Sequence, residues 1–436
     1  MPDLSDRLIE YVKRAEDEMK PVFERIDDIS FRNTERVLQA FRYHKVSEAS
    51  FAPTTGYGYT DPGRDRLEQI YAHVFGAEAA LVRMQIVSGT HALTIALFGI
   101  LRPRDVMLSV AGRPYDTLEQ VIGLSGTAGN GSLKDFGITY DEVELNASGR
   151  LDYEAIARAM DKAGNNLKMV FVQRSKGYLN RRTLTVQEIG ELADFVHRRA
   201  PGTFVVVDNC YGEFTEDREP TSVGADLCVG SLIKNPGGGM AETGAYLAGS
   251  ARAVELVSYR YSSPGTGAEA GATLGQNKNM YKGLFYAPHT VAQALKTAHL
   301  AAYLFEKLGC EVEPRWDETR SDIIQTVRTL SKERMCALCE GIQSASPVDA
   351  YVTPIPVPMP GYADEVIMAA GAFTSGSSIE LSADGPIRPP YTVYLQGGLT
   401  YESGKIGIMA AARMMIDRGL LELKESTTHH LNPDGF

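Results

Sequence analysis

The chain has 436 residues, of which 44% are hydrophobic and 23% are charged, so it is long enough for more than one structural unit and has enough apolar side chains for a sizeable core. Its 44 basic and 55 acidic residues give a formal net charge of -11, which argues against a general binder of nucleic acid or of anionic membranes, because both need a basic surface. No apolar run has the pattern of a signal peptide or the length of a membrane-spanning helix, so we expect a cytoplasmic protein.

The first fifty-six residues, 1–56, place apolar residues at helical spacing in LIEYVKRAEDEMKPVFERI and TERVLQAFRYHKV. We expect a helical arm and inter-subunit segment there. The following stretch, FAPTTGYGYTDPGRDRL, is dense in Gly, Pro and Thr and is typical of an ordered loop that displays Tyr57 and Tyr59. Loops of this composition often carry function.

From residue 57 to residue 265, short apolar runs alternate with helical patterns. Several runs are continuous rather than alternating, as expected for parallel strands covered on both faces: AALVRMQI, DVMLSV, KMVFVQ and TFVVVDN. The sequence therefore predicts a large α/β domain with a mostly parallel sheet. Residues 266–436 give a long helical stretch and then a mixed pattern, which predicts a smaller C-terminal α+β domain.

The five cysteines are too few and too scattered for a disulfide framework. Cys336 and Cys339 form a C-x-x-C, but their stretch is apolar and helix-like, with no second pair and no nearby His, so we interpret them as buried thiols. His429 and His430 are typical of a solvated tail. We therefore expect no metal site.

Two residues in the large domain carry the chemical signal. A buried-strand run ends in Asp208, at the sheet edge where parallel sheets bind ligands, and Lys234 follows in SLIKNPGGG, where the glycines leave its amine accessible. A pyridoxal phosphate (PLP) enzyme needs this pair, because the lysine forms a Schiff base with the cofactor and the aspartate keeps the pyridine nitrogen protonated. A helix-capping aspartate and a surface lysine would show the same spacing.

A third feature lies upstream, where an apolar strand runs through Ser88, Gly89 and Thr90 into an apolar helix. The N–H groups at such a helix start can hold a phosphate. Turns of this kind are common in α/β proteins. This one therefore indicates a cofactor phosphate site only in combination with Asp208 and Lys234.

Longer strings give a specific resemblance that extends from about Tyr57 to Ile408. The strings QRSKGY, DNCYGEFTEDREPTSVGADL, SLIKNPGGG, EGIQSASPVDAYVTP and IELSADGPIRPPYTVYLQGGLTYE resemble the methionine γ-lyase-like branch, often labelled aluminium-resistance protein, of the Cys/Met metabolism PLP-dependent enzymes. The resemblance implies the fold type I PLP-dependent transferase architecture with a seven-stranded sheet. It also implies PLP as cofactor and a homodimer or homotetramer with shared active sites.

The resemblance also implies roles for individual residues. Lys234 would hold PLP and move the substrate's protons, and Asp208 would pair with the pyridinium nitrogen. Tyr115, 25 residues after Thr90, would stack on the PLP ring and serve as acid or base near the leaving group, unless it only caps the sheet edge. Gln173 is a candidate partner for the phenolic oxygen of PLP.

The resemblance places the phosphate on four residues, Ser88, Gly89, Thr90 and Ser231. Ile233 stands where the larger group often has a hydroxyl residue, so we expect one phosphate contact to be missing.

The loop that would reach a neighbouring subunit departs from the family. Aligning on Pro62 puts Gly56 and Gly58 where the larger group has a tyrosine and an arginine. We expect Tyr59 to contact the neighbouring active site, with Tyr57 near the substrate and Arg64 as a candidate replacement cation. The same residues could instead be structural in a tight loop.

An α-amino-acid substrate needs its carboxylate held, usually by a bidentate arginine. Arg388, in a proline-flanked loop, is the first candidate, against the alternative of a surface salt bridge; Arg174 and Arg113 are alternates. Glu242 places an unexpected acid in the lysine loop and is a candidate substrate contact.

The leading functional hypothesis is a lyase that acts on an L-amino acid by γ-elimination and releases a thiol, a 2-oxo acid and ammonia, as methionine γ-lyase and the cystathionine lyases do. β-Elimination stays open. One alternative is γ-elimination or γ-replacement on a modified, for example halogenated, amino acid, to which Glu242 points. Further alternatives are a catalytically inactive PLP-fold binding or metal-stress protein and an aminotransferase. The expected partner is a small-molecule amino acid, with no nucleic acid and no membrane.

Overall fold

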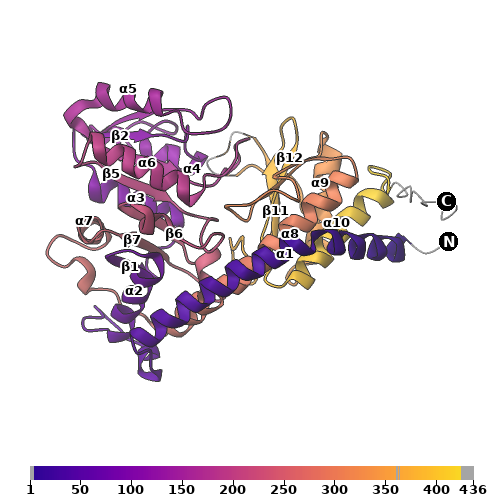
Figure 1. Cartoon of the computed structure of the whole chain (residues 1–436), viewed down its shortest axis with the longest axis horizontal. Coiled ribbons are helices and arrows are strands. Elements are labelled where there is room, and N and C mark those ends of the chain that lie inside the picture. Colours follow the sequence, from indigo (N-terminus) through magenta and orange to yellow (C-terminus); the bar gives the residue numbers. More distant parts are fainter. Residues whose placement is uncertain (1–3, 360–361, 363, 424–436) are drawn as a thin grey trace, which may run out of the picture.

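Two β-sheets organise the chain, as the computed structural model shows for residues 4–359, 362 and 364–423 (Figure 1). The first sheet has seven strands in the order β1-β7-β6-β5-β4-β2-β3, and only β7 pairs with its neighbours in antiparallel fashion. The strands are β1 (Ala79–Arg83), β2 (Val106–Ser109), β3 (Thr139–Glu142), β4 (Leu167–Gln173), β5 (Phe204–Asp208), β6 (Leu227–Ser231) and β7 (Ala245–Gly249). The prediction of a mostly parallel α/β fold is confirmed.

Helices cover both faces of this sheet, which explains why its central strands are apolar throughout. The helices are α2 (Pro62–Phe75), α3 (Gly89–Ile100), α4 (Asp116–Ile122), α5 (Tyr153–Ala163), α6 (Val186–Arg199) and α7 (Ala251–Tyr261). Helices α3, α4 and α7 share one apolar core with the sheet, and α2, α5 and α6 share the other. In β4, for example, Val170 packs on one side while Phe171 packs on the opposite side.

The second sheet is antiparallel throughout, with the order β10-β11-β12-β9-β8. Its strands are β8 (Glu311–Glu313), β9 (Gln325–Arg328), β10 (Val366–Ala369), β11 (Ser382–Pro386) and β12 (Thr392–Gln396). Helices α9 (Lys332–Ser344) and α10 (Tyr401–Asp417) pack against it and complete a separate apolar core. The C-terminal part is therefore α+β, as its mixed pattern indicates.

The N-terminal segment forms one helix, α1 (Leu4–Tyr43), rather than the separate helical pieces expected. It runs beside α8 (Asn277–Lys307) along both parts of the molecule (Figure 1). Leu8 and Val12 are buried in the C-terminal core, whereas Val37 and Ala40 are buried in the core of the first sheet. This helix is thus packed into its own subunit along its length, and a contact with a second subunit stays a prediction.

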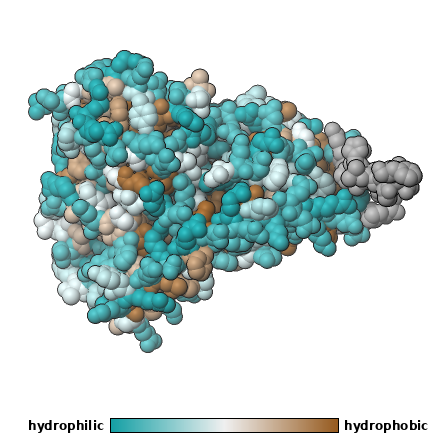
Figure 2. All heavy atoms as spheres, in the orientation of Figure 1, coloured by the Kyte–Doolittle hydropathy of each residue, from teal (hydrophilic) through white to brown (hydrophobic). Residues whose placement is uncertain are grey.

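The surface and the cysteines add two observations. Figure 2 shows a mainly hydrophilic face, with hydrophobic residues gathered where the broad α/β part meets the narrower C-terminal part. Both cysteines of the C-x-x-C lie on α9 as free thiols, but only Cys339 is buried, whereas Cys336 is half-buried because it lies on a side of the helix nearer the protein surface. Within the described ranges, no group of His, Cys, Asp and Glu side chains is arranged to hold a metal ion. In that same part of the chain, no helix is long and apolar enough to cross a bilayer. His429 and His430 lie outside the described residues.

Candidate active site

A cavity of about 300 Å³ lies at the carboxyl edge of the parallel sheet, where the two parts of the molecule meet. Gln173, Asp208 and Ser231 are the last residues of β4, β5 and β6, and all three line it. The register sets Gln173 directly beside Asp208. Because parallel strands end at one edge, residues far apart in the sequence converge there, as expected for a ligand site in an α/β sheet.

The turn before α3 supplies anion-binding groups. Ser88 is the N-cap of this helix, and its Oγ accepts a hydrogen bond from the His91 N–H at 3.0 Å. The first N–H groups of a helix have no intrahelical partner and carry the positive end of its dipole. A Cβ at Gly89 would lie in ordinary contact with Cys210 Sγ at 3.5 Å, and it would fill space that glycine leaves open at this end of the cavity.

Tyr115 is fixed between the start of helix α3 and the end of strand β4. Its hydroxyl lies 2.8 Å from Thr90 Oγ1, and its backbone N–H donates to Gln173 Oε1 at 2.8 Å. Burial raises the pKa of Tyr115, and the nearby Asp208 carboxylate raises it further. The phenol is therefore neutral and available as a proton donor. Gln173 uses its amide to hold Tyr115 and the Ser175 carbonyl at 3.2 Å, so its contact with the phenolic oxygen of PLP stays a prediction.

Asp208 is buried at the tip of β5, and its Oδ1 accepts a hydrogen bond from the Cys210 N–H at 3.2 Å. Burial raises the pKa of this carboxyl, while Lys234 and the Cys210 N–H oppose the rise. A buried carboxylate of this kind is well suited to pair with a protonated ring nitrogen.

Lys234 follows β6 and points at Tyr211, whose ring centre lies 3.9 Å from Nζ. Burial raises the pKa of the Tyr211 phenol, while the nearby Lys234 opposes this rise. Tyr211 has a positive φ of 72°, in the turn directly after β5. The sequence reading missed Tyr211, although its position three residues after Asp208 gave a usable signal.

The opposite wall comes from the C-terminal sheet and from the loop after β4. Asp384 on β11 and Tyr394 on β12 are cross-strand partners, and both line the cavity with Tyr178. Burial raises the pKa of Asp384 to about 7, while hydrogen bonding from Tyr178 and the charge of Lys234 lower it. The sequence analysis gave these three residues no role, although they lie in the strings QRSKGY and IELSADGPIRPPYTVYLQGGLTYE. The second sheet brings Asp384 and Tyr394 to the cavity, and the loop after β4 brings Tyr178.

The sequence matches a known family over most of its length. The family model described as methionine gamma-lyase matches residues 8–416. The chain belongs to the methionine γ-lyase family.

Relatives at high identity extend over nearly the whole chain. The uncharacterized protein YnbB of Bacillus subtilis is 54% identical over 407 residues, which cover 93% of this chain and 96% of that protein. A candidate cystathionine beta-lyase involved in aluminium resistance, from Listeria monocytogenes, is 51% identical with a TM-score of 0.90, covering 92% of this chain and 98% of that one. A carbon-sulfur lyase involved in aluminium resistance, from Clostridium novyi, is 48% identical with a TM-score of 0.90, covering 94% and 96% of the two chains. The chain is therefore a PLP-dependent lyase.

The residues of this lyase fit the cofactor that its family uses. Ser88, Gly89, Thr90 and Ser231 surround the anion-binding end of the cavity, and Ile233 lines it without offering a hydroxyl group. Asp208 would meet the ring nitrogen, Tyr115 would cover the ring, and Lys234 would bind the aldehyde. When bound, PLP withdraws electrons from the substrate's Cα and so makes its proton acidic.

Several residues predicted to bind the substrate lie elsewhere in the lyase. Arg388 is 54% exposed, and its Nη1 pairs with Asp364 Oδ2 at 3.2 Å outside the cavity. Glu242 is exposed and accepts hydrogen bonds from Gln276 and Asn279. Arg113 pairs with Glu119 on α4. Among the residues that the structure describes, no arginine lines the cavity.

The loop with Tyr57 and Tyr59 lies on the surface. The two rings stack with their centres 5.4 Å apart, and both are exposed. Arg64 is buried beneath the loop and donates to the Gly58 carbonyl at 2.7 Å and to the Gly271 carbonyl at 3.1 Å. Arg64 therefore holds the loop in place, and the contact of Tyr59 with a neighbouring active site stays a prediction.

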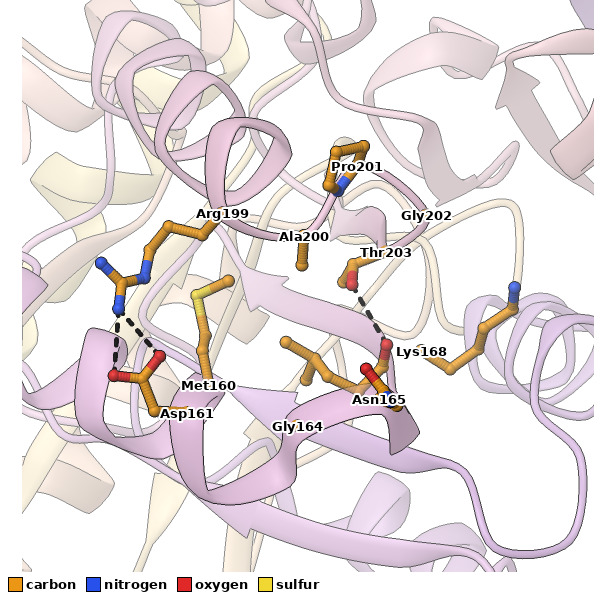
Figure 3. A pocket seen from close by; sticks show the side chains of 11 residues that line it. Met160, Asp161, Gly164, Asn165, Lys168, Arg199, Ala200, Pro201, Gly202 and Thr203 are labelled. Atoms are coloured by element: carbon orange, nitrogen blue, oxygen red, sulfur yellow. Dashed lines mark hydrogen bonds and ion pairs between the residues drawn. The ribbon is translucent and has the colours of Figure 1, made fainter.

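A larger hollow of about 720 Å³ opens at the other edge of the first sheet, where α5 ends and β4 begins (Figure 3). Arg199 and Asp161 pair with each other at 2.8 Å, and Thr203 Oγ1 donates to the Leu167 carbonyl at 3.1 Å. Two of its polar pairs, Arg199 with Asp161 and Thr203 with Leu167, are thus bonded to each other. We place the active site at the carboxyl edge, where Lys234 and Asp208 meet.

Proposed function

We propose that this protein is a PLP-dependent carbon–sulfur lyase that removes a thiol from the side chain of an L-amino acid by γ-elimination. The observation that carries the proposal is the convergence of Lys234, Asp208 and Tyr115 on one cavity. The names of its relatives, a carbon-sulfur lyase and a candidate cystathionine beta-lyase, support cleavage at sulfur.

Each of the three residues has a distinct task in this proposal. The Lys234 amine accepts the Cα proton of the substrate and, for γ-elimination, a second proton from Cβ. Tyr115, whose hydroxyl is oriented by Thr90 at 2.8 Å, donates a proton to the departing thiolate. Asp208 keeps positive charge on the cofactor's ring nitrogen, which favours loss of the Cα proton.

The substrate's α-carboxylate needs donors other than a cavity arginine of the same chain. A homodimer or homotetramer with shared sites would supply them from a neighbouring subunit, and the exposed Tyr57 and Tyr59 are placed to take part in such a contact. The halogenated-substrate alternative loses its support, because Glu242 lies outside the cavity.

The test uses the purified, PLP-loaded protein beside Lys234→Ala. We expect the wild-type protein to show the visible absorption band of lysine-bound PLP and to release a thiol and 2-oxobutyrate from homocysteine-type thioethers. The Lys234→Ala variant should show neither the band nor the two products. Lys168→Ala is the matched control, because Lys168 lines the hollow at the opposite sheet edge. Pyruvate from cysteine-type thioethers would show β-elimination instead.

Two results would overturn the proposal. The absence of a band after PLP is added would remove the enzyme interpretation. Amino transfer to an added 2-oxo acid without thiol release would identify an aminotransferase.

A further inference from the structure

Asp384 places a carboxylate on the cavity wall opposite Lys234, and the proposed elimination gives this carboxylate no role. Asp384 is only 8% exposed and sits on β11, a central strand of the second sheet. Its neighbours are fixed, because β11 pairs with β10 on one side and with β12 on the other. A side chain held on the interior strand of a sheet has a defined position, which is what a specificity residue needs.

One oxygen of this carboxylate is free to bind a ligand. The Tyr178 hydroxyl is near enough to lower the pKa of Asp384, and the buried Asp384 Oδ1 atom has no hydrogen-bond partner within the described residues. A buried polar atom without a hydrogen-bond partner is unfavourable. A ligand group that donates a hydrogen bond to Oδ1 would remove this deficit.

The surroundings of Asp384 favour a cation. The Tyr178 and Tyr394 ring centres lie 4.8 Å apart, and Tyr394 Oη donates to the Tyr178 carbonyl at 2.7 Å, so the two rings form a rigid aromatic corner beside the carboxylate. Aromatic faces and a carboxylate together attract ammonium groups. No arginine of the described chain lines the cavity to favour an acidic substrate side chain.

We propose that Asp384, Tyr178 and Tyr394 form a subsite for an ammonium group on the substrate's side chain, beyond the bond that is cleaved. This inference rests on the proposed lyase function and narrows its substrate class to thioether amino acids that carry a second amino group. A neutral alkyl side chain would leave the Asp384 oxygen unpaired and would be disfavoured on that account.

The preference for a cation should depend on pH, since burial places the pKa of Asp384 at about 7. The titratable groups that face it are Tyr178, Tyr211, Tyr362, Tyr394, Cys339 and Lys234. Burial raises the pKa of each of these tyrosines and of the cysteine, so they stay neutral near pH 7. In the PLP-loaded protein, Lys234 would be bound to the cofactor. Asp384 is then the wall group that gains charge between about pH 6 and about pH 8.

The experiment compares two ligands of equal shape on the PLP-loaded protein. S-(2-aminoethyl)-homocysteine and S-propyl-homocysteine differ only in a terminal ammonium in place of a methyl group, and the same pair can be built on cysteine. Binding is measured from the change in the visible spectrum. We expect the aminoethyl compound to bind about 10- to 100-fold more tightly at about pH 8, and this preference to fall about 5- to 10-fold at about pH 6.

The variants separate specificity from folding. Asp384→Asn should reduce the preference to less than about 3-fold while the affinity for the propyl compound stays within about 2-fold. Tyr178→Phe, which keeps the ring and removes the hydroxyl, should retain most of the preference. Glu213→Gln is the matched control, because this buried carboxyl accepts from Tyr246 Oη at 2.9 Å and does not line the cavity.

The outcomes distinguish failure of the ammonium subsite from failure of the proposed lyase function. Equal binding and cleavage of both compounds by the wild-type protein would refute the ammonium subsite and leave the lyase function standing. No spectral change with either compound would refute both proposals. The wild-type pH dependence tests the subsite even if Asp384→Asn does not fold, because a preference that does not change with pH would contradict the role of Asp384.

Discussion

Arg174 shows how the structure decides between two roles for a residue that the sequence could not separate. As a candidate for the substrate's carboxylate it would have to face the cavity, yet its side chain is fully buried behind it. Its guanidinium donates to Asn209 Oδ1 at 2.7 Å and to the carbonyls of Gly212 and Leu184 at 3.0 and 3.2 Å, and it pairs with Glu216 at 2.6 Å. These bonds hold the turn that follows Asp208.

The substitution Arg174→Lys tests this scaffold role. Lysine keeps the charge but lacks the planar fork, so it can satisfy Glu216 and at most one further acceptor. The Gly212 carbonyl keeps its hydrogen bond from Thr215 Oγ1 at 2.7 Å, so at least one buried acceptor, Asn209 Oδ1 or the Leu184 carbonyl, loses its donor. At about 1 to 3 kcal/mol for such an acceptor, we expect the free energy of unfolding to fall by about 1 to 3 kcal/mol. Urea unfolding followed by circular dichroism measures the change, and a weaker PLP affinity should accompany it.

A matched control is Arg252→Lys, whose exposed pair with Glu255 contributes less than about 1 kcal/mol. If Arg174→Lys instead keeps the wild-type stability and raises only the KM for the amino acid, the scaffold role is wrong and substrate binding is favoured.

Three further changes test other parts of the structure. Replacing Asp384 with Asn removes a carboxyl whose folded pKa of about 7 exceeds its unfolded value of about 3.9. As the pH rises from about 5 to about 7, the free energy of unfolding of the wild-type protein should therefore fall by at most about 3 kcal/mol relative to that of the variant. If urea unfolding gives the same difference between wild type and variant at both pH values, this reasoning is wrong. Arg64→Lys should loosen the loop that carries Tyr57, so chymotrypsin should cleave there faster than in the wild type, and an unchanged cleavage rate would exclude the anchoring role. Gly341→Ala would place a Cβ 2.4 Å from Ala411 Cα between α9 and α10, which should lower the free energy of unfolding by about 1 to 3 kcal/mol, with an unchanged urea midpoint as the contrary result.

The strands of the first sheet could be predicted because burial on both faces makes their sequences apolar throughout. KMVFVQ and TFVVVDN coincide with β4 and β5 almost residue for residue. The sequence could not show that α1 is one helix that packs into both the core of the first sheet and the C-terminal core. Its apolar stripe indicates a helix, but the partners of that stripe lie hundreds of residues away.

The residues expected to contact the phosphate and ring of PLP, and the lysine, could be predicted from the sequence. Each of them follows a strand, and parallel strands end at one edge of the sheet. Lys234, Asp208 and Ser231 therefore line the cavity as that rule requires. Arg388 could not be placed in the same way. Its loop follows an antiparallel strand of the second sheet, and the sequence does not say how that sheet is oriented against the first.

The sequence by itself determined the α/β class, the family resemblance and the catalytic edge, because these depend on local periodicity and on residues next to strand ends. The tertiary structure alone decided what faces Lys234 across the cavity. Asp384 and Tyr394 reach the site through cross-strand pairing and the packing of two sheets, and Arg174 is withdrawn from it by bonds to a distant turn. Contacts between residues far apart in the chain set these positions, and no local pattern in the sequence records them.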